Sequence, residues 1–131
     1  MIQTREILFD HVRLLAPVVN GNVVEMPYKT IDEFGTYCGA GHGVGDWLVP
    51  DVFRGHVRIS VCCFLHDVSW MLAERTMENF IGTNKMFRDN MLSVIDARVH
   101  DIQDHLAACQ LAITYFGAVQ TVGKHIFFRK C

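Results

Sequence analysis

The chain from residue 56 to the C-terminus contains no proline, and this feature constrains the fold more than any other. Proline breaks helix interiors, so long helices are permitted throughout this part of the chain. Apolar residues with helical spacing run through residues 57–75 and again through residues 92–116. The first set is Val57, Val61, Phe64, Leu65, Val68 and Leu72, and the second is Leu92, Ile95, Val99, Ile102, Leu106, Cys109, Ile113 and Phe116. The sequence therefore predicts a mainly α protein, in which the second set forms one long helix or two shorter ones packed against the first helix.

The first predicted helix is expected to be buried on both sides, because the face opposite its apolar stripe carries Cys63, His66 and Trp70 in place of charges. The second region includes residues 106–123, which contain no charged residue and approach the length needed to cross a bilayer. Its glutamines and threonines favour a buried core helix over a membrane-inserted tail. The stripe at residues 92–116 could equally form the seam of a homo-oligomer.

The first 55 residues have a different composition. Residues 1–20 mix apolar and charged side chains, and we expect a short helix there that ends near Pro17. Residues 20–55 hold seven of the ten glycines together with Pro27 and Pro50, which predicts a long loop with one small strand pair. Long loops in a compact domain commonly carry function.

Composition limits the classes of function. A chain of 131 residues is expected to form one domain over residues 1–131. Half of its residues are hydrophobic and 20% are charged, which excludes a disordered chain. The formal net charge of −2 argues against a nucleic-acid-binding protein. No secretory signal is visible at the start, so the sequence does not indicate a compartment.

Two segments carry the residues suited to chemistry. Residues 37–43 read Tyr-Cys-Gly-Ala-Gly-His-Gly, and residues 62–70 read Cys-Cys-Phe-Leu-His-Asp-Val-Ser-Trp. A glycine-rich backbone can turn its carbonyl oxygens toward a hard cation such as Ca²⁺, and Asp67 offers the carboxylate that such an ion also needs. Successive helical residues point about 100° apart, so His66 is a candidate general base and Asp67 a candidate metal ligand in one cavity.

The pattern Tyr-Cys-Gly-x-Gly followed by Cys-Cys-x-x-His-Asp resembles the secreted phospholipase A2 family, calcium-dependent enzymes that cleave the sn-2 ester of glycerophospholipids. The match covers residues 37–70, about a quarter of the chain. It implies a phospholipase A2-like fold with two long antiparallel helices, a glycine-rich calcium loop and little or no β structure. It also implies an enzyme that works at a phospholipid membrane or micelle surface, and it favours a secreted or virion-associated setting.

The resemblance assigns a role to each matching residue. Ca²⁺ would be held by the backbone carbonyls of Tyr37, Gly39 and Gly41 and by the carboxylate of Asp67. His66 would be the base that activates water. The backbone N–H of Gly39 would help to hold the oxyanion, an electrostatic contribution that is commonly the largest in ester hydrolysis.

The chain also departs from the family pattern, at Asn84, Ser69 and Trp70. Asn84 stands where the family has an aspartate that orients the catalytic histidine, and Asp89 is a less well placed substitute. An asparagine can accept the ring N–H but cannot offset the charge of the imidazolium, so slow turnover is expected. Ser69 replaces a half-cystine, and Trp70 replaces a tyrosine with a side chain that only donates hydrogen bonds.

The family's disulfides suggest further pairings. The matching positions imply a bond between Cys38 and Cys63 that ties the loop to the catalytic helix, and a second bond between Cys62 and Cys109. Cys131 would then be the odd thiol. In a reducing compartment all five cysteines would instead be small buried hydrophobic residues.

Three other interpretations stay open. A zinc site could be built from Cys38, Cys62 or Cys63, His42 and His66, although the chain lacks a paired Cys-x-x-Cys. Cys62 or Cys63 could act as a nucleophile beside a histidine. A phospholipase-like fold could also be kept as a non-catalytic structural or membrane-binding module, such as a component of a viral particle, which Asn84 and the long apolar stripe favour.

Overall fold

The computed structural model describes residues 2–35, 52–53 and 57–129. The helices are α2 (Ser60–Leu72), α3 (Met77–Arg98), α4 (Ile102–Thr121) and α5 (Gly123–Arg129), and η1 (Asp32–Phe34) is a short 3-10 helix. One sheet contains β1 (Thr4–Phe9), β2 (Val12–Val19) and β3 (Asn22–Val23), and a second pairs β4 (Val52–Phe53) with β5 (Val57–Arg58). The described part of the chain is mainly α, as the sequence predicts.

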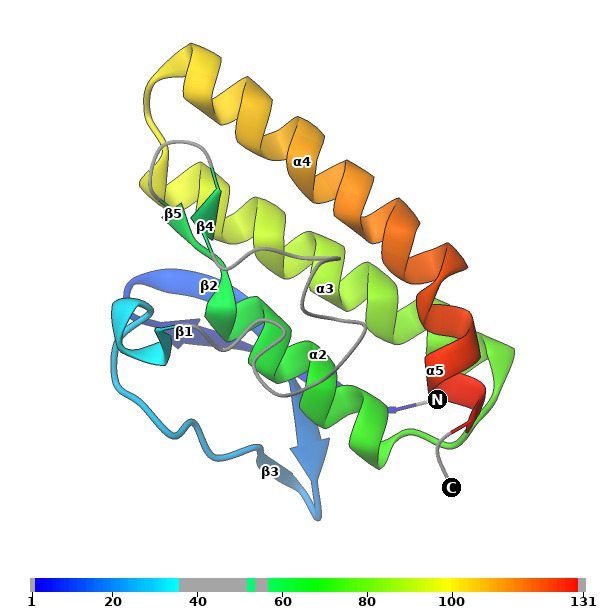
Figure 1. Ribbon diagram of the computed structural model, residues 1–131. Coiled ribbons are helices and arrows are strands. Elements are labelled where there is room, and N and C mark those ends of the chain that lie inside the picture. The colour runs from blue at the N-terminus through cyan, green and yellow to red at the C-terminus, as the bar shows by residue number, and fades with distance from the viewer. Residues whose placement is uncertain (1, 36–51, 54–56, 130–131) are drawn as a thin grey trace.

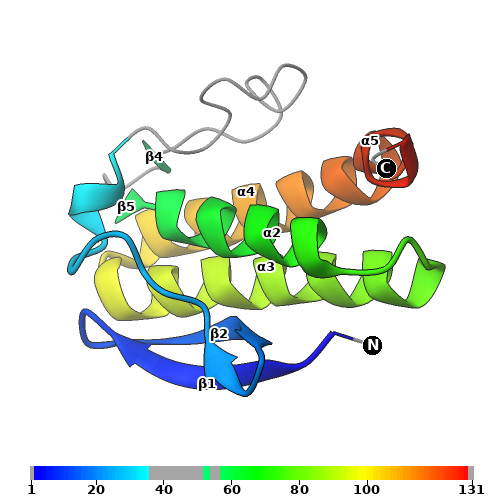
Figure 2. The same cartoon turned by 90° about the horizontal axis from the view of Figure 1, so that it is seen from below.

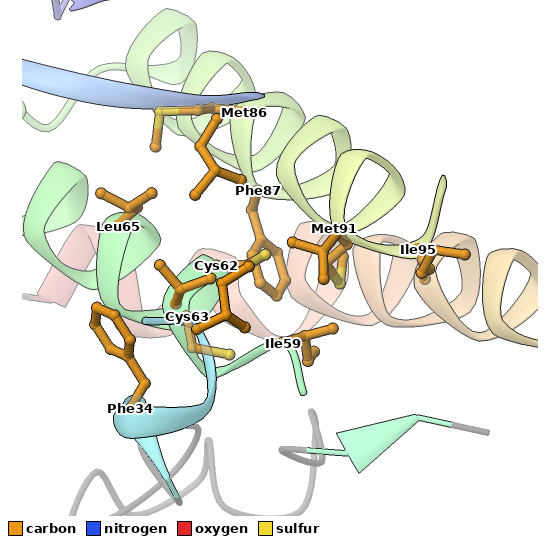
Figure 3. Close-up of a cluster of buried hydrophobic side chains, with 14 of the residues drawn as sticks. Phe34, Ile59, Cys62, Cys63, Leu65, Met86, Phe87, Met91 and Ile95 are labelled. Carbon is orange, nitrogen blue, oxygen red and sulfur yellow. The ribbon is translucent and has the colours of Figure 1, made fainter. Parts of the chain in front are cut away.

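Helix α3 lies at the centre of the fold. The N-terminal sheet covers one side of it, and α2 and α4 pack along its other sides (Figures 1 and 2). Phe87, Met91 and Ile95 of α3 meet Leu65 of α2 and Ile59 in a core in which each side chain is at most 1% exposed (Figure 3). Because α3 contacts the N-terminal sheet, α2 and α4, residues on its different faces connect the sheet to both of these helices.

The N-terminal residues form a β-meander, so the helix expected in residues 1–20 is wrong, and so is the expectation of little or no β structure. Strands β1 and β2 pair antiparallel from Thr4 opposite Pro17 to Phe9 opposite Val12, and β3 adds to the far side of β2. Both turns contain two residues with positive φ, Asp10 and His11 in the first and Asn20 and Gly21 in the second. Such turns match the twist of a hairpin. One face of β2 packs on α3, and this tertiary contact stabilises the sheet.

The predicted helix at residues 57–75 corresponds to α2, which is shorter because Val57 belongs to β5. The prediction that it is buried on both sides is confirmed for most of its length, since Cys62, Cys63, His66, Ser69 and Trp70 are buried along with Val61 and Leu65 of the apolar stripe. Phe64 and Val68 of that stripe are half-buried, and Leu72 is 44% exposed. The two longest described helices, α3 and α4, run antiparallel and are joined by a link at residues 99–101 (Figure 1), whereas His66 and Asp67 lie on the shorter α2, so the phospholipase A2-like helix pair stays a prediction.

The second apolar stripe is divided by this link. Asp101 accepts a hydrogen bond from the N–H of Asp104 and so caps α4, which starts a new helix in the middle of the stripe. Ile95 and Val99 are buried, whereas Ile102, Leu106 and Ile113 are 73%, 64% and 48% exposed. The stripe is therefore core at its start and surface at its end, and a homo-oligomer formed through it stays a prediction.

None of the described helices is long and apolar enough by itself to cross a membrane. Helices α4 and α5 meet the length and composition criteria only as a pair, and their axes bend by 47° at the break between them. The buried residues of α4 are the small Ala108 and Ala112 together with Val119. The expected buried core helix over residues 106–123 is thus buried along one face only.

Candidate functional site

His66 and Asn84 meet in the interior between α2 and α3. His66 is 6% exposed, and its Nε2 lies 2.7 Å from Oδ1 of Asn84, which is fully buried. An amide oxygen only accepts hydrogen bonds, so the imidazole donates from Nε2–H, and Nδ1 carries the lone pair of the neutral ring. The structure thus brings together the candidate base and the residue expected to orient it, which are 18 positions apart in the sequence.

A third side chain extends this network to α4. The Nδ2 group of Asn84 donates to Oε1 of Gln120 at 2.6 Å. Each end of the Asn84 amide therefore has one partner, with the oxygen toward His66 and the nitrogen toward Gln120. In the sequence, Gln120 stands out only as a polar residue in the uncharged segment 106–123. That position argues against membrane insertion but does not predict the contact with Asn84.

Aromatic rings hold the imidazole in place. The ring of Phe87 stacks on His66 with centroids 4.6 Å apart, and the Trp70 ring lies 4.5 Å away at a steeper angle. The indole N–H of Trp70 donates to Thr83 at 3.0 Å. Trp70 therefore bonds to α3 one position before Asn84, and its hydrogen bond joins the same two helices.

Asp89, the alternative partner for the histidine, is engaged elsewhere. Its Oδ1 accepts from the guanidinium of the neighbouring Arg88 at 2.9 and 3.0 Å. The hydrogen bond that positions the imidazole within the described residues comes from the neutral amide of Asn84.

The expected calcium ligands are described only in part. Asp67 follows His66 on α2 and is half-buried. Its carboxylate suits a hard divalent cation, which prefers oxygen ligands. Tyr37, Gly39 and Gly41, expected to contribute carbonyls, lie outside the described residues, as do the Gly39 N–H expected at the oxyanion and the residue His42.

Two of the cysteine predictions can be compared with the structure. Cys63 is disulfide-bonded, and the expected partner Cys38 lies outside the described residues. The predicted bond between Cys62 and Cys109 is wrong, because both are free. Cys62 is fully buried in the core beneath α2, whereas Cys109 lies half-buried on α4.

The burial of Cys62 also bears on the rival interpretations. Desolvation raises the pKa of its thiol far above the ordinary range, so it stays protonated and behaves as a small hydrophobic residue. It is not an activated nucleophile, and it belongs to no group of three metal-ligating side chains in the described part of the chain. Because the sulfur of Cys63 is in a disulfide, it is not a thiolate ligand either.

No protein-family model, curated protein or solved structure matches this chain. A function for this chain is therefore inferred from the two motifs and from the geometry around His66.

Proposed function

We propose that the protein is a calcium-dependent, phospholipase A2-like hydrolase that cleaves the sn-2 ester of glycerophospholipids at a membrane or micelle surface. The observation that supports this most is the 2.7 Å hydrogen bond between His66 and Asn84. A buried imidazole held at Nε2, with the lone pair on Nδ1, has the form required of a general base. Its neighbour on α2, Asp67, has the carboxylate required for calcium.

In the proposed reaction, Nδ1 of His66 takes a proton from water, and this water attacks the sn-2 carbonyl carbon. No acyl-enzyme forms. Asn84 holds the ring through Nε2–H, and Phe87 and Trp70 prevent it from turning. Bound Ca²⁺ supplies positive charge near the developing oxyanion, with Asp67, Tyr37, Gly39 and Gly41 as its expected ligands and the Gly39 N–H as a second donor.

The neutral amide at Asn84 sets an expectation for the rate. A carboxylate in this place stabilises the imidazolium that forms when the ring accepts a proton, and an amide does not. Replacement of the carboxylate by an amide in the serine protease triad costs about 10⁴-fold in kcat, largely through the wrong tautomer. Asn84 preserves the correct tautomer here, so we expect slow turnover rather than none.

The same residue favours a second candidate function. His66, Asn84 and Gln120 form a neutral hydrogen-bonded chain across α2, α3 and α4. Such a chain also serves to align three helices in a stable core. The alternative is therefore a non-catalytic phospholipase-like module that binds membranes or assembles into a larger particle.

Lipid hydrolysis separates the two candidates directly. Purified protein would be incubated with phosphatidylcholine vesicles containing anionic lipid, in Ca²⁺ or in chelator, and released fatty acid and lyso-lipid would be measured by mass spectrometry. The hydrolase proposal expects products in Ca²⁺ only. His66→Gln should abolish them, while His125→Gln, which changes an exposed histidine on α5, should not.

Calorimetry tests the metal assignment separately from turnover. Asp67→Asn should abolish Ca²⁺ binding, and His66→Gln should leave it intact. A parent protein that binds Ca²⁺ but releases no fatty acid supports the non-catalytic module. Equal Ca²⁺ affinity in parent and Asp67→Asn would refute the assignment of this carboxylate.

A further inference from the structure

A second cluster of reactive side chains lies at the corner where α3 turns into α4, and the proposed hydrolase does not use it. Nε2 of His105 lies 2.8 Å from Oδ1 of Asp96, and Nδ1 of the same ring lies 3.7 Å from Sγ of Cys109. One ligand atom from each residue lies within 4.8 Å of the other two. This is the one group of three such side chains that the described residues contain.

The fold places these residues on rigid elements. His105 and Cys109 are four positions apart on α4, so they project from the same face in successive turns. Asp96 lies in the last turn of α3, and the link at residues 99–101 turns the chain so that this carboxylate faces α4. The capping carboxylate of Asp101 fixes the start of α4 and with it the position of His105.

The three ligand types point to one class of cation. Thiolate, imidazole and carboxylate together are typical zinc ligands, whereas Ca²⁺ and Mg²⁺ prefer oxygen alone. Tetrahedral Zn²⁺, with a Zn–S bond of about 2.3 Å and a Zn–N bond of about 2.0 Å, separates sulfur and nitrogen by roughly 3.5 Å. In the structure Sγ of Cys109 lies 3.7 Å from Nδ1 of His105, so Nδ1 is the nitrogen that can share an ion with the sulfur, while Nε2 faces Asp96.

We propose that this corner binds Zn²⁺ through Cys109 and His105 of α4 and Asp96 of α3, with water completing the coordination. The side chain of Asp96 is 69% exposed and can follow the ion, while that of His105 is 32% exposed and open to solvent. The ion displaces the proton of the thiol and binds the lone pair of Nδ1, while Nε2 keeps its hydrogen and the Asp96 carboxylate moves from Nε2 to the ion. It links the end of one helix to the start of the next.

A Cys-His-Asp arrangement also suggests a nucleophilic thiol, and two observations disfavour it. Burial, followed by the charge of Asp96, raises the pKa of the Cys109 thiol, whereas a cysteine nucleophile needs a lowered value. Cys109 also lies in the interior of α4, where backbone N–H groups bond within the helix and are not available to an oxyanion. A bound cation neutralises the charge of Asp96 and stabilises the thiolate, and it needs no free backbone N–H group.

The test uses the full-length protein after removal of metals, handled without oxygen so that Cys109 stays a thiol. Parent protein should withdraw one equivalent of Zn²⁺ from a chromophoric chelator. Cys109→Ser, His105→Gln and Asp96→Asn should each weaken the apparent affinity at least about tenfold. His125→Gln, a change at an exposed histidine outside the corner, should compete as the parent does.

Cobalt gives a spectroscopic readout that does not depend on stability. Co²⁺ in the parent should show the intense visible bands of four-coordinate cobalt and a thiolate charge-transfer band in the near ultraviolet, and Cys109→Ser should lose the latter. Failure of the parent to compete for Zn²⁺, equal competition by all variants, or a cobalt spectrum without thiolate bands would each overturn the proposal. None of these measurements involves lipid hydrolysis.

Discussion

Asn90 should be the main polar connection between the N-terminal sheet and the helices. Its Oδ1 accepts from the backbone N–H of Leu15 at 2.7 Å, and its Nδ2 donates to the backbone C=O of the same residue at 2.9 Å. Asn90 is 1% exposed and lies on α3, whereas Leu15 lies on β2, 75 positions away in the sequence. One side chain therefore satisfies both backbone groups of a strand residue.

Asn90→Ala leaves these two backbone groups unpaired. A buried donor or acceptor that loses its partner costs about 1–3 kcal/mol. Leu15 is half-buried, so the lower part of that range applies to each group. The better helix propensity of alanine returns roughly 0.5 kcal/mol. The free energy of unfolding should therefore fall by about 1.5–3.5 kcal/mol, a large fraction of the roughly 5–15 kcal/mol typical of a domain.

Urea unfolding followed by circular dichroism measures this loss. Lys85→Ala is the matched control, because it also places alanine on α3 but at an exposed position, and it should change stability by less than about 0.5 kcal/mol. Hydrogen exchange adds a local readout, since the Leu15 amide should lose protection in Asn90→Ala. A loss below about 1 kcal/mol together with a protected Leu15 amide would refute the reasoning.

Three further predictions address the proposed active site, the loss of stability at low pH and the packing of α5. Asn84→Asp keeps the acceptor at the imidazole and adds the charge that offsets its protonated form, so fatty-acid release should rise at least about tenfold; an unchanged rate would assign the orienting role elsewhere. The N–H of Ile31 and the guanidinium of Arg98 hold the pKa of Asp10 below its usual 3.8. The resulting stability is present above that pH and is lost as the pH falls through the lower folded-state value. Asp10→Asn should therefore be less stable than the parent in urea at pH 7, by a difference that shrinks in acid; a constant difference would count against the mechanism. A Cβ at Gly123 would lie 3.0 Å from the Trp70 ring, so Gly123→Ala should lower stability by about 1–3 kcal/mol. Gly117→Ala meets nothing within 4 Å and should not lower it, and equal melting temperatures for the two variants would contradict this account.

Local sequence signals predicted the helical part of the fold because each acts within a few residues. The absence of proline and the helical spacing indicated helices within residues 57–75 and 92–116, which contain α2, the last turns of α3 and most of α4, whereas residues 77–91 of α3 lie in neither range. The division at Asp101 follows from capping, which is also a local signal, although the sequence alone left open whether the second stripe forms one long helix or two shorter ones.

The N-terminal sheet also had a local signal that our prediction missed. Asn20 and Gly21 lie between valine-rich segments, and an Asn-Gly pair in that setting is a strong indication of a two-residue hairpin turn. Strand β2 alternates buried and exposed residues at its start, from Val12 to Leu14. The expectation of a helix gave too much weight to the mixture of charged and apolar residues and too little to this period of two.

The contact between His66 and Asn84 could not be predicted from local sequence signals. It was expected from the resemblance to a family, since nothing in the spacing of the two residues indicates that they touch. The addition of Gln120 to the pair, and the union of Asp96 with His105 and Cys109, have no counterpart in the motif at all.

The sequence by itself determined where helices can form, where they are capped and where hairpins turn, because these choices depend on backbone preferences and on neighbours within one or two turns. Only the tertiary structure decided which polar side chains meet. The partner of Asn90 is 75 positions away and that of Gln120 is 36 positions away. Such pairs depend on how α3 is rotated and shifted against β2, α2 and α4, which is settled by the packing of the whole core and by no single segment.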